Sequence, residues 1–158
     1  MRVQLKLILD APPDAVWAAL RSPSVFTEVA HPLFSFEPLS PRGFPRRWSE
    51  GEHHVAASVL WGMIPVGEQI IDISYHERGD VRIVEDAGGP VSGALAVVTG
   101  WRHRMAVSAG PGGATLFRDR LDISAGVLTP LVWLGTWLFW QWRGFQLSRL
   151  APRWRADR

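Results

Sequence analysis

A histidine and an aspartate near the end of the chain have the types and spacing best suited to chemistry. Residues 94–107 and 114–124 alternate polar and apolar side chains around the glycine-rich turn SAGPGG, a pattern that predicts a β-hairpin. If the hairpin is centred near Pro111, His103 lies opposite Asp119 on a mostly apolar face. We expect this face to point into the protein.

Two interpretations of this pair remain open from the sequence. A histidine held by a carboxylate in an apolar cavity can act as a general base, so His103 and Asp119 are candidate catalytic residues. Buried polar groups also need partners, because burying either one alone is costly, and a structural or ligand-orienting pair is the more common arrangement. Whether the protein is an enzyme is therefore undecided at this point.

Other kinds of site lack support. Glu52 and His54 share one strand face, but two ligands at this spacing do not make a metal site, and we predict neither metal nor cofactor. The absence of cysteine excludes disulfides and thiolate nucleophiles. The sequence has no Gly-x-Ser-x-Gly elbow, Walker loop or dinucleotide fingerprint.

The composition is that of an ordinary globular protein. With 158 residues, 47% of them hydrophobic and 20% charged, the chain is expected to form a single domain, residues 1–158. The net charge is only +2 and the arginines are scattered, so we predict no nucleic-acid partner. The first ten residues alternate polar with apolar and lack the apolar run of a signal peptide, which favours a cytoplasmic location.

The order of elements suggests an antiparallel sheet. A strand at 2–10 precedes two short helices, opened by Pro12-Pro13 and by Ser22-Pro23. Further strands are expected at 33–39, 53–61, 67–77, 81–86, 94–107 and 114–124. Turn-like segments join them with no helical crossover, which indicates an antiparallel meander.

A long helix is expected at the end of the chain, from about 129 to 150. Thr129 suits the N-cap, Pro130 suits the first helical position, and Ala151-Pro152 is expected to end the helix. This is the only element long enough to cover the sheet. We therefore predict an α+β fold in which a curved antiparallel sheet of about seven strands wraps around this helix.

These features resemble the helix-grip fold of the START-like, or SRPBCC, superfamily. The resemblance rests on the opening strand leading into ILDAPPDAVWAAL, the strand GWRHRMAV, the turn into ATLFRDRLDI, and the helix ending WRGFQLSRLAPRW. It implies a deep, largely apolar cavity between sheet and helix that holds a hydrophobic small molecule such as a lipid or polyketide. A cyclase or dehydratase using His103 and Asp119 is the alternative that the superfamily suggests.

Candidate ligand contacts come from the inward strand face, a strand end and one stripe of the helix. They are Trp61, Tyr75, Trp101, Met105, Phe117, Leu134, Leu138 and Trp142. The three helix residues Leu134, Leu138 and Trp142 belong to an apolar stripe that also contains Leu131 and Phe145. We expect this stripe to face the sheet.

A second apolar stripe of the same helix then needs another partner. It consists of Trp133, Trp137, Trp140 and Leu147, of which the three tryptophans most need a partner. Arginines cluster just after the tryptophans at 143, 149, 153, 155 and 158. Such a face suits the surface of a membrane or a homodimer contact, a third candidate function. The apolar run is shorter than the roughly 20 residues that cross a bilayer.

Overall fold

The computed structural model describes residues 1–156, so Arg158 of the predicted arginine group lies outside the described residues. The elements in chain order are β1 (Arg2–Leu9), α1 (Pro13–Leu20), α2 (Pro23–Ala30), β2 (Phe34–Pro38), β3 (His53–Leu60), β4 (Ile64–Arg78), β5 (Val81–Asp86), β6 (Gly89–Pro90), β7 (Gly100–Ala109), β8 (Thr115–Ser124) and α3 (Thr129–Ala156). Three short 3-10 turns are η1 (Gly93–Val97), η2 (Pro111–Gly113) and η3 (Gly126–Leu128).

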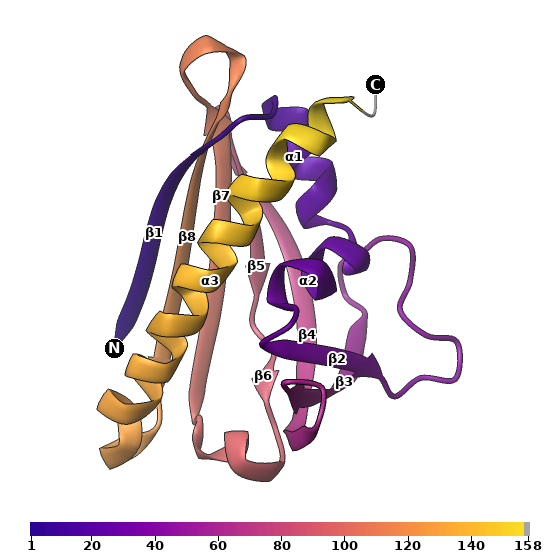
Figure 1. Ribbon diagram of the computed structural model, residues 1–158, viewed down its shortest axis with the longest axis vertical. Helices are drawn as coiled ribbons and strands as arrows, with labels where there is room; N and C mark the ends of the chain where they lie inside the picture. The colour runs from indigo at the N-terminus through magenta and orange to yellow at the C-terminus, as the bar shows by residue number, and fades with distance from the viewer. Residues whose placement is uncertain (157–158) are drawn as a thin grey trace.

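One curved antiparallel sheet holds all the strands in the order β1-β8-β7-β5-β4-β3-β2, and β6 pairs with β4. The helix α3 runs across the concave side of this sheet, and α1 and α2 cover the part of that side that α3 leaves open (Figure 1). A proline opens each short helix, at Pro13 and Pro23, as the sequence predicts. The predicted α+β helix-grip architecture is confirmed.

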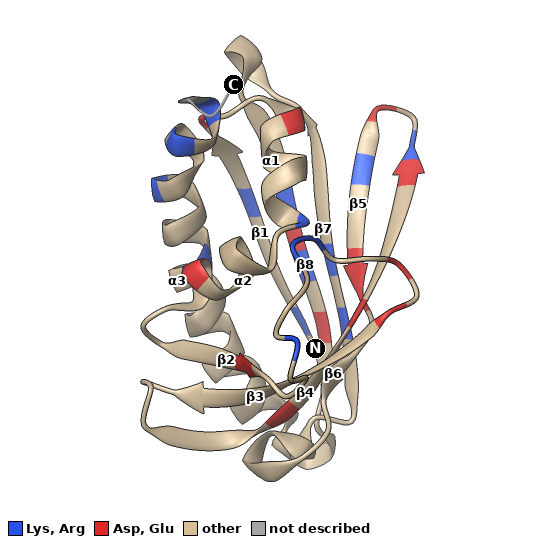
Figure 2. Ribbon diagram, turned by 90° about the vertical axis from the view of Figure 1, so that its right-hand side faces the viewer, with Lys and Arg blue, Asp and Glu red and all other residues tan. Residues whose placement is uncertain are grey.

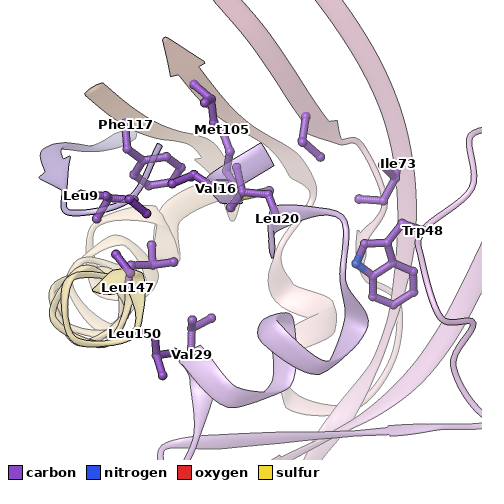
Figure 3. Packing of buried hydrophobic residues seen from close by; sticks show 14 of the residues in the cluster. Leu9, Val16, Leu20, Val29, Trp48, Ile73, Met105, Phe117, Leu147 and Leu150 are labelled. Carbon is purple, nitrogen blue, oxygen red and sulfur yellow. The ribbon is translucent and has the colours of Figure 1, made fainter. Parts of the chain in front are cut away.

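The main hydrophobic core lies between α1, the sheet and the second half of α3. Leu9, Phe117 and Leu147 are almost completely buried and face one another across this space (Figure 3). A smaller cluster built around Leu121 and Trp140 lies beside the first half of α3. The two clusters divide the helix into two regions with different surroundings.

The predicted β7–β8 hairpin exists, but its boundaries and register differ from the expectation. β7 begins at Gly100 because residues 93–97 form η1 instead of a strand. The turn is centred at Gly112, and both Gly112 and Gly113 adopt positive φ. The register therefore pairs His103 with Leu121 and not with Asp119. A shift of two residues keeps each side chain on its predicted face.

The predicted end of the terminal helix is wrong. α3 continues through Pro152 to Ala156. Proline removes the bond to the carbonyl of Ser148, but Ser148 and Pro152 are both exposed, so water can solvate that carbonyl. Trp154 packs against the main core, which favours the last turn.

The orientation predicted for the two apolar stripes of α3 is wrong. The stripe with Trp133 and Trp140 faces the sheet, and most of the leucine stripe is exposed. Trp140 is only 2% exposed and Trp133 packs against the smaller cluster, whereas Leu131, Leu134, Leu138 and Phe145 are strongly exposed. Trp137 is also exposed. Arg143, predicted to lie in a surface arginine group, is buried between α3 and the sheet. Helical spacing identifies residues that share a face but does not say which of two apolar faces is buried.

Candidate functional site

An apolar cavity of about 450 Å³ lies between the first half of α3 and the sheet. Its walls come from β2, the turn between β3 and β4, η1, the edges of β7 and β8, and α3. The lining residues are Leu33, Phe34, Phe36, Leu60, Trp61, Gln69, Pro90, Ala94, Leu95, Val97, Val98, Trp101, Ile123, Val132, Gly135, Thr136, Leu138, Phe139 and Trp140.

This lining contains no charged side chain and almost no polar one. Gln69 and Thr136 are the exceptions, and the Thr136 hydroxyl already donates to the carbonyl of Val132 at 2.8 Å. Ligand pockets commonly have volumes of about 300–1,000 Å³ and mostly apolar walls. The cavity therefore suits an uncharged, hydrophobic molecule.

Two glycines allow η1 to form one wall of the cavity. A Cβ at Gly67 would lie 1.9 Å from the carbonyl oxygen of Ser92, and one at Gly93 would lie 2.5 Å from Gly67. The Ser92 hydroxyl also accepts a hydrogen bond from the Glu68 amide at 3.0 Å. This close approach seats η1 directly against β4.

A buried cluster of ionisable groups lies deeper between α3 and the sheet. The Nε2 atom of His103 is 2.7 Å from Oδ1 of Asp119, and a guanidinium nitrogen of Arg143 is 3.6 Å from Oδ2 of Asp119. Asp86 stands directly opposite His103 in the β5–β7 register, and its Oδ1 accepts the amides of Asp72 and Gly88. We call Asp86, His103, Asp119 and Arg143 the polar core. All four of its members are buried, and the most accessible, Asp86, is 7% exposed.

The two carboxylates of the polar core differ in their affinity for protons. Burial raises the pKa of Asp86, and its hydrogen bonds and His103 oppose this only in part. Burial also acts to raise the pKa of Asp119, but the contact with His103 and the nearby Arg143 lower it below the ordinary value. Asp119 is therefore the carboxylate held in its ionised form.

The polar core and the apolar cavity are separated by aromatic rings. The rings of Trp140 and His103 lie 5.1 Å apart, and the Trp140 ring also carries Arg143 over one face at 5.1 Å. Trp101 packs edge-on against Trp140 at 6.1 Å. Both tryptophans line the cavity, but no member of the polar core does. Asp86, His103 and Arg143 instead border a chamber of only about 40 Å³.

The structure brings three of the predicted ligand contacts together. Trp61, Trp101 and Leu138 line the apolar cavity from the β3–β4 turn, β7 and α3. Trp61 adopts φ +52° at the tip of its turn, which directs an exposed indole to the cavity edge.

The other five predicted contacts lie elsewhere. The Tyr75 hydroxyl donates to the carbonyl of Trp48 at 2.7 Å, and Phe117 is completely buried in the main core. Met105 borders the small chamber, with its sulfur 3.8 Å from Arg143. Leu134 is exposed outside the cavity, and Trp142 donates its indole N–H to the carbonyl of His31 at 3.1 Å. Their assignment followed from the wrong stripe of α3 and from treating the whole strand face as cavity wall.

Asp86 and Arg143 are members of the polar core that the sequence analysis did not identify. Asp86 is the last residue of the predicted strand 81–86, and no spacing in the sequence links it to His103. Arg143 is the first charged residue of α3 and directly follows a stretch, residues 123–142, that contains no charged side chain. A single arginine embedded in an apolar run was the available signal, since a buried charge requires a partner.

Other hollows differ from the apolar cavity in their chemistry. A groove of about 800 Å³ under the loop after β2 is bordered by Arg42, Glu52 and His53. Within residues 1–156 there is no group of three or more His, Asp or Glu side chains arranged to hold a metal ion. No helix in that range has both the length and the hydropathy to cross a membrane.

The sequence matches no family model and no curated protein. Solved structures do match. A protein of Chromobacterium violaceum aligns with TM-score 0.63 and 16% identity over 95% of this chain and 96% of that one. A hypothetical protein of Helicobacter pylori aligns with TM-score 0.69 and 11% identity over 96% and 88%. The chain has the helix-grip fold.

A plant enzyme has the same fold. A point mutant of norcoclaurine synthase from Thalictrum flavum, in complex with a transition-state analogue, aligns with TM-score 0.60 and 13% identity over 97% of this chain and 94% of that one. At this level of identity the likeness concerns the fold. The predicted resemblance to START-like proteins is thus confirmed as a shared architecture.

Proposed function

We propose that the protein binds an uncharged hydrophobic small molecule, such as a lipid or polyketide, in the apolar cavity. The observation that carries this proposal is the lining, which holds 450 Å³ of space without one charged side chain. A charged ligand group would lose its hydration there without gaining a partner. The fold supports the proposal because sheet and helix leave this space open.

Gly135 offers a direct test. It lines the cavity, and a Cβ built at this position meets no atom within 4 Å. Gly135→Trp should fill the cavity without displacing other groups, whereas Gly135→Ala is a matched control that leaves most of the space. The uncharged dye N-phenyl-1-naphthylamine should bind the wild-type protein and the Ala variant, as followed by fluorescence titration.

We expect Gly135→Trp to weaken this binding at least roughly tenfold, since the apolar contacts of the ligand would be lost. The anionic dye 8-anilinonaphthalene-1-sulfonate should bind the wild-type protein less tightly than the neutral dye. Unchanged binding to Gly135→Trp would rule out this cavity as the ligand site.

A second candidate function, proton-transfer catalysis of the cyclase or dehydratase type, is favoured by the contact between His103 and Asp119. In this alternative His103 is the general base and Asp119 orients it. Arg143 also holds Asp119, which equally suits a structural ion network. His103→Gln tests the alternative, because loss of turnover on an identified substrate with unchanged ligand affinity would support catalysis. Full activity of the variant would exclude it.

A further inference from the structure

Three stretches of the chain contain no Asp, Glu, Lys, Arg or His: residues 55–67, 87–101 and 123–142. Each stretch contributes to the wall of the apolar cavity, through Trp61, Val97 and Leu138 respectively. The β3–β4 turn, η1 and the start of α3 thus meet at one end of the molecule, the lower end in Figure 1. Figure 2 shows that charged residues are concentrated away from this region. We call it the charge-free end.

Large apolar side chains protrude from the charge-free end. Val127 is 96% exposed, Met63 77% and Leu131 69%. Within the described residues, the strongly exposed large apolar side chains outside the three stretches are Met1, Ile8, Leu39 and Phe145. Single exposed apolar residues are normal, but such a concentration around a cavity marks a surface that contacts another apolar phase.

We propose that the charge-free end inserts shallowly into the surface of a lipid bilayer. The backbone of its protruding turns is compatible with a bilayer. Backbone groups that enter an apolar phase must be hydrogen-bonded within the protein, because that phase cannot replace their hydrogen bonds to water. Met63 donates its N–H to Leu60, Leu128 donates to Ala125, and the amide of Ala125 donates to the Thr129 hydroxyl. These three backbone N–H groups therefore keep their hydrogen bonds when the turns enter the bilayer.

The polar side chains of the charge-free end are few and uncharged, which favours a bilayer over a protein partner. A protein interface forms roughly one hydrogen bond per 100–200 Å² and has a polar rim. The polar side chains of the cavity wall are Gln69 and Thr136, and the Thr136 hydroxyl already donates to the carbonyl of Val132 within α3. A hydrocarbon surface requires no such partners.

Positive groups lie where lipid headgroups would be. The Met1 amine, Arg2 and Arg102 border one surface hollow together with Trp101. Asp122 and Glu85 pair with these arginines at 2.7 and 3.0 Å, so the local excess of positive charge is small. Attraction to anionic headgroups then adds to insertion without being its main cause.

The proposal concerns a second activity of the chain, because docking does not require that the cavity be filled. If the protein both binds a ligand in the cavity and docks on a bilayer, a hydrophobic ligand can pass between bilayer and cavity without crossing water. Gly135→Trp separates the two, since it should weaken dye binding and leave vesicle binding unchanged.

Flotation of the full chain with vesicles of phosphatidylcholine and phosphatidylglycerol tests the proposal. The wild-type protein should float with the vesicles, and Met63→Asp and Val127→Asp should each weaken binding roughly tenfold, because an inserted apolar side chain is replaced by a charge. Ile8→Asp is the matched control. Ile8 is also an exposed apolar residue, 52% exposed, but it lies near the C-terminal end of β1 and outside the charge-free end. Circular dichroism verifies that each variant is folded.

Absence of wild-type binding would overturn the proposal, as would equal binding of the Met63→Asp and control proteins. Sedimentation equilibrium tests whether the charge-free end instead binds a second copy of the chain. A wild-type dimer that Met63→Asp converts to a monomer, with no vesicle binding, would assign the charge-free end to a second copy of the chain and would also overturn the proposal.

Discussion

The space between α3 and the sheet has two regions of opposite character. Around the middle of α3, Arg143 lies buried over Asp119 and His103, and only about 40 Å³ of space remains. Toward the start of α3, the walls carry no charge and about 450 Å³ is open. Trp140 forms the boundary and contacts both regions. One helix and one pair of strands therefore support a closed polar region and an open apolar one.

This difference separates the stability of the fold from its binding function. In the polar core each ionised group has a partner, so removing one group leaves a buried charge. Several side chains of the cavity wall, such as Trp61 and Leu138, are strongly exposed, so changes there should affect ligands more than folding. Five predictions test this division, and they begin with the largest expected effect.

Asp119→Ala should destabilise the protein by about 3–5 kcal/mol, because Arg143 would stay buried without its carboxylate partner. Asp122→Ala on the same strand removes a partly exposed carboxylate that pairs with Arg2, Arg104 and Arg120, and it should cost only about 1 kcal/mol because water can solvate these arginines. Urea denaturation measures both. Similar losses for the two variants would show that the polar core has no special role in stability.

Leu147→Ala should cost about 2–5 kcal/mol, because Leu147 is 1% exposed in the main core. Leu138→Ala, on the face of α3 that borders the cavity, should change stability by less than about 0.5 kcal/mol and should weaken dye binding. Thermal unfolding and dye titration of both variants provide the comparison. The opposite order of destabilisation would restore the predicted orientation of the stripes.

Asp86→Asn should increase stability near neutral pH. The raised pKa of Asp86, caused mainly by burial, means that the folded state becomes less stable as pH rises from the unfolded pKa, about 3.9, through the folded pKa. Asparagine cannot ionise, and its oxygen can still accept the amides of Asp72 and Gly88. The advantage of the variant should shrink as the pH falls, as urea midpoints across a pH series would reveal.

Asp119 should behave with the opposite sign. Its lowered pKa contributes stability that is present above the unfolded pKa and is lost as pH falls through the folded pKa. Asp119→Asn should therefore differ most from the wild type at neutral pH and least in acid, and it should be the less stable protein. An Asp86→Asn protein that is less stable than the wild type at neutral pH would contradict the opposite directions of the two pKa shifts.

The smallest effect is expected for Gly135→Ala. Glycine inside a helix is less favourable than alanine by about 1 kcal/mol, and the added methyl group meets no neighbour. The melting temperature should rise slightly while dye affinity stays the same. A fall in the melting temperature would mean that the wall of the cavity near Gly135 is more tightly packed than the structure indicates.

Much of the fold could be predicted because local signals agreed with one another. Alternation marked β1, prolines marked the starts of α1 and α2, and glycine-rich turns separated the strands. The pairing of His103 with Asp119 was reached through a register that was wrong by two residues, and the two side chains meet only because that shift preserves the face.

The arrangement of the site could not be predicted in the same way. Both faces of α3 are apolar, so spacing could not decide whether Trp140 or Leu138 is buried. The depth of the cavity depends on η1, which lies against β4 through a backbone contact at Gly67 that no hydrophobic pattern encodes. Arg143 acquired its partner from a strand 24 residues earlier in the chain.

The most direct test of the account is to map the amide chemical shifts that change when N-phenyl-1-naphthylamine binds. We predict that the largest changes occur in the β3–β4 turn, η1 and the first half of α3, around Trp61, Val97 and Val132. Changes centred instead on His103, Asp119 and Arg143 would place the ligand in the polar core and would contradict the assignment of binding to the apolar cavity.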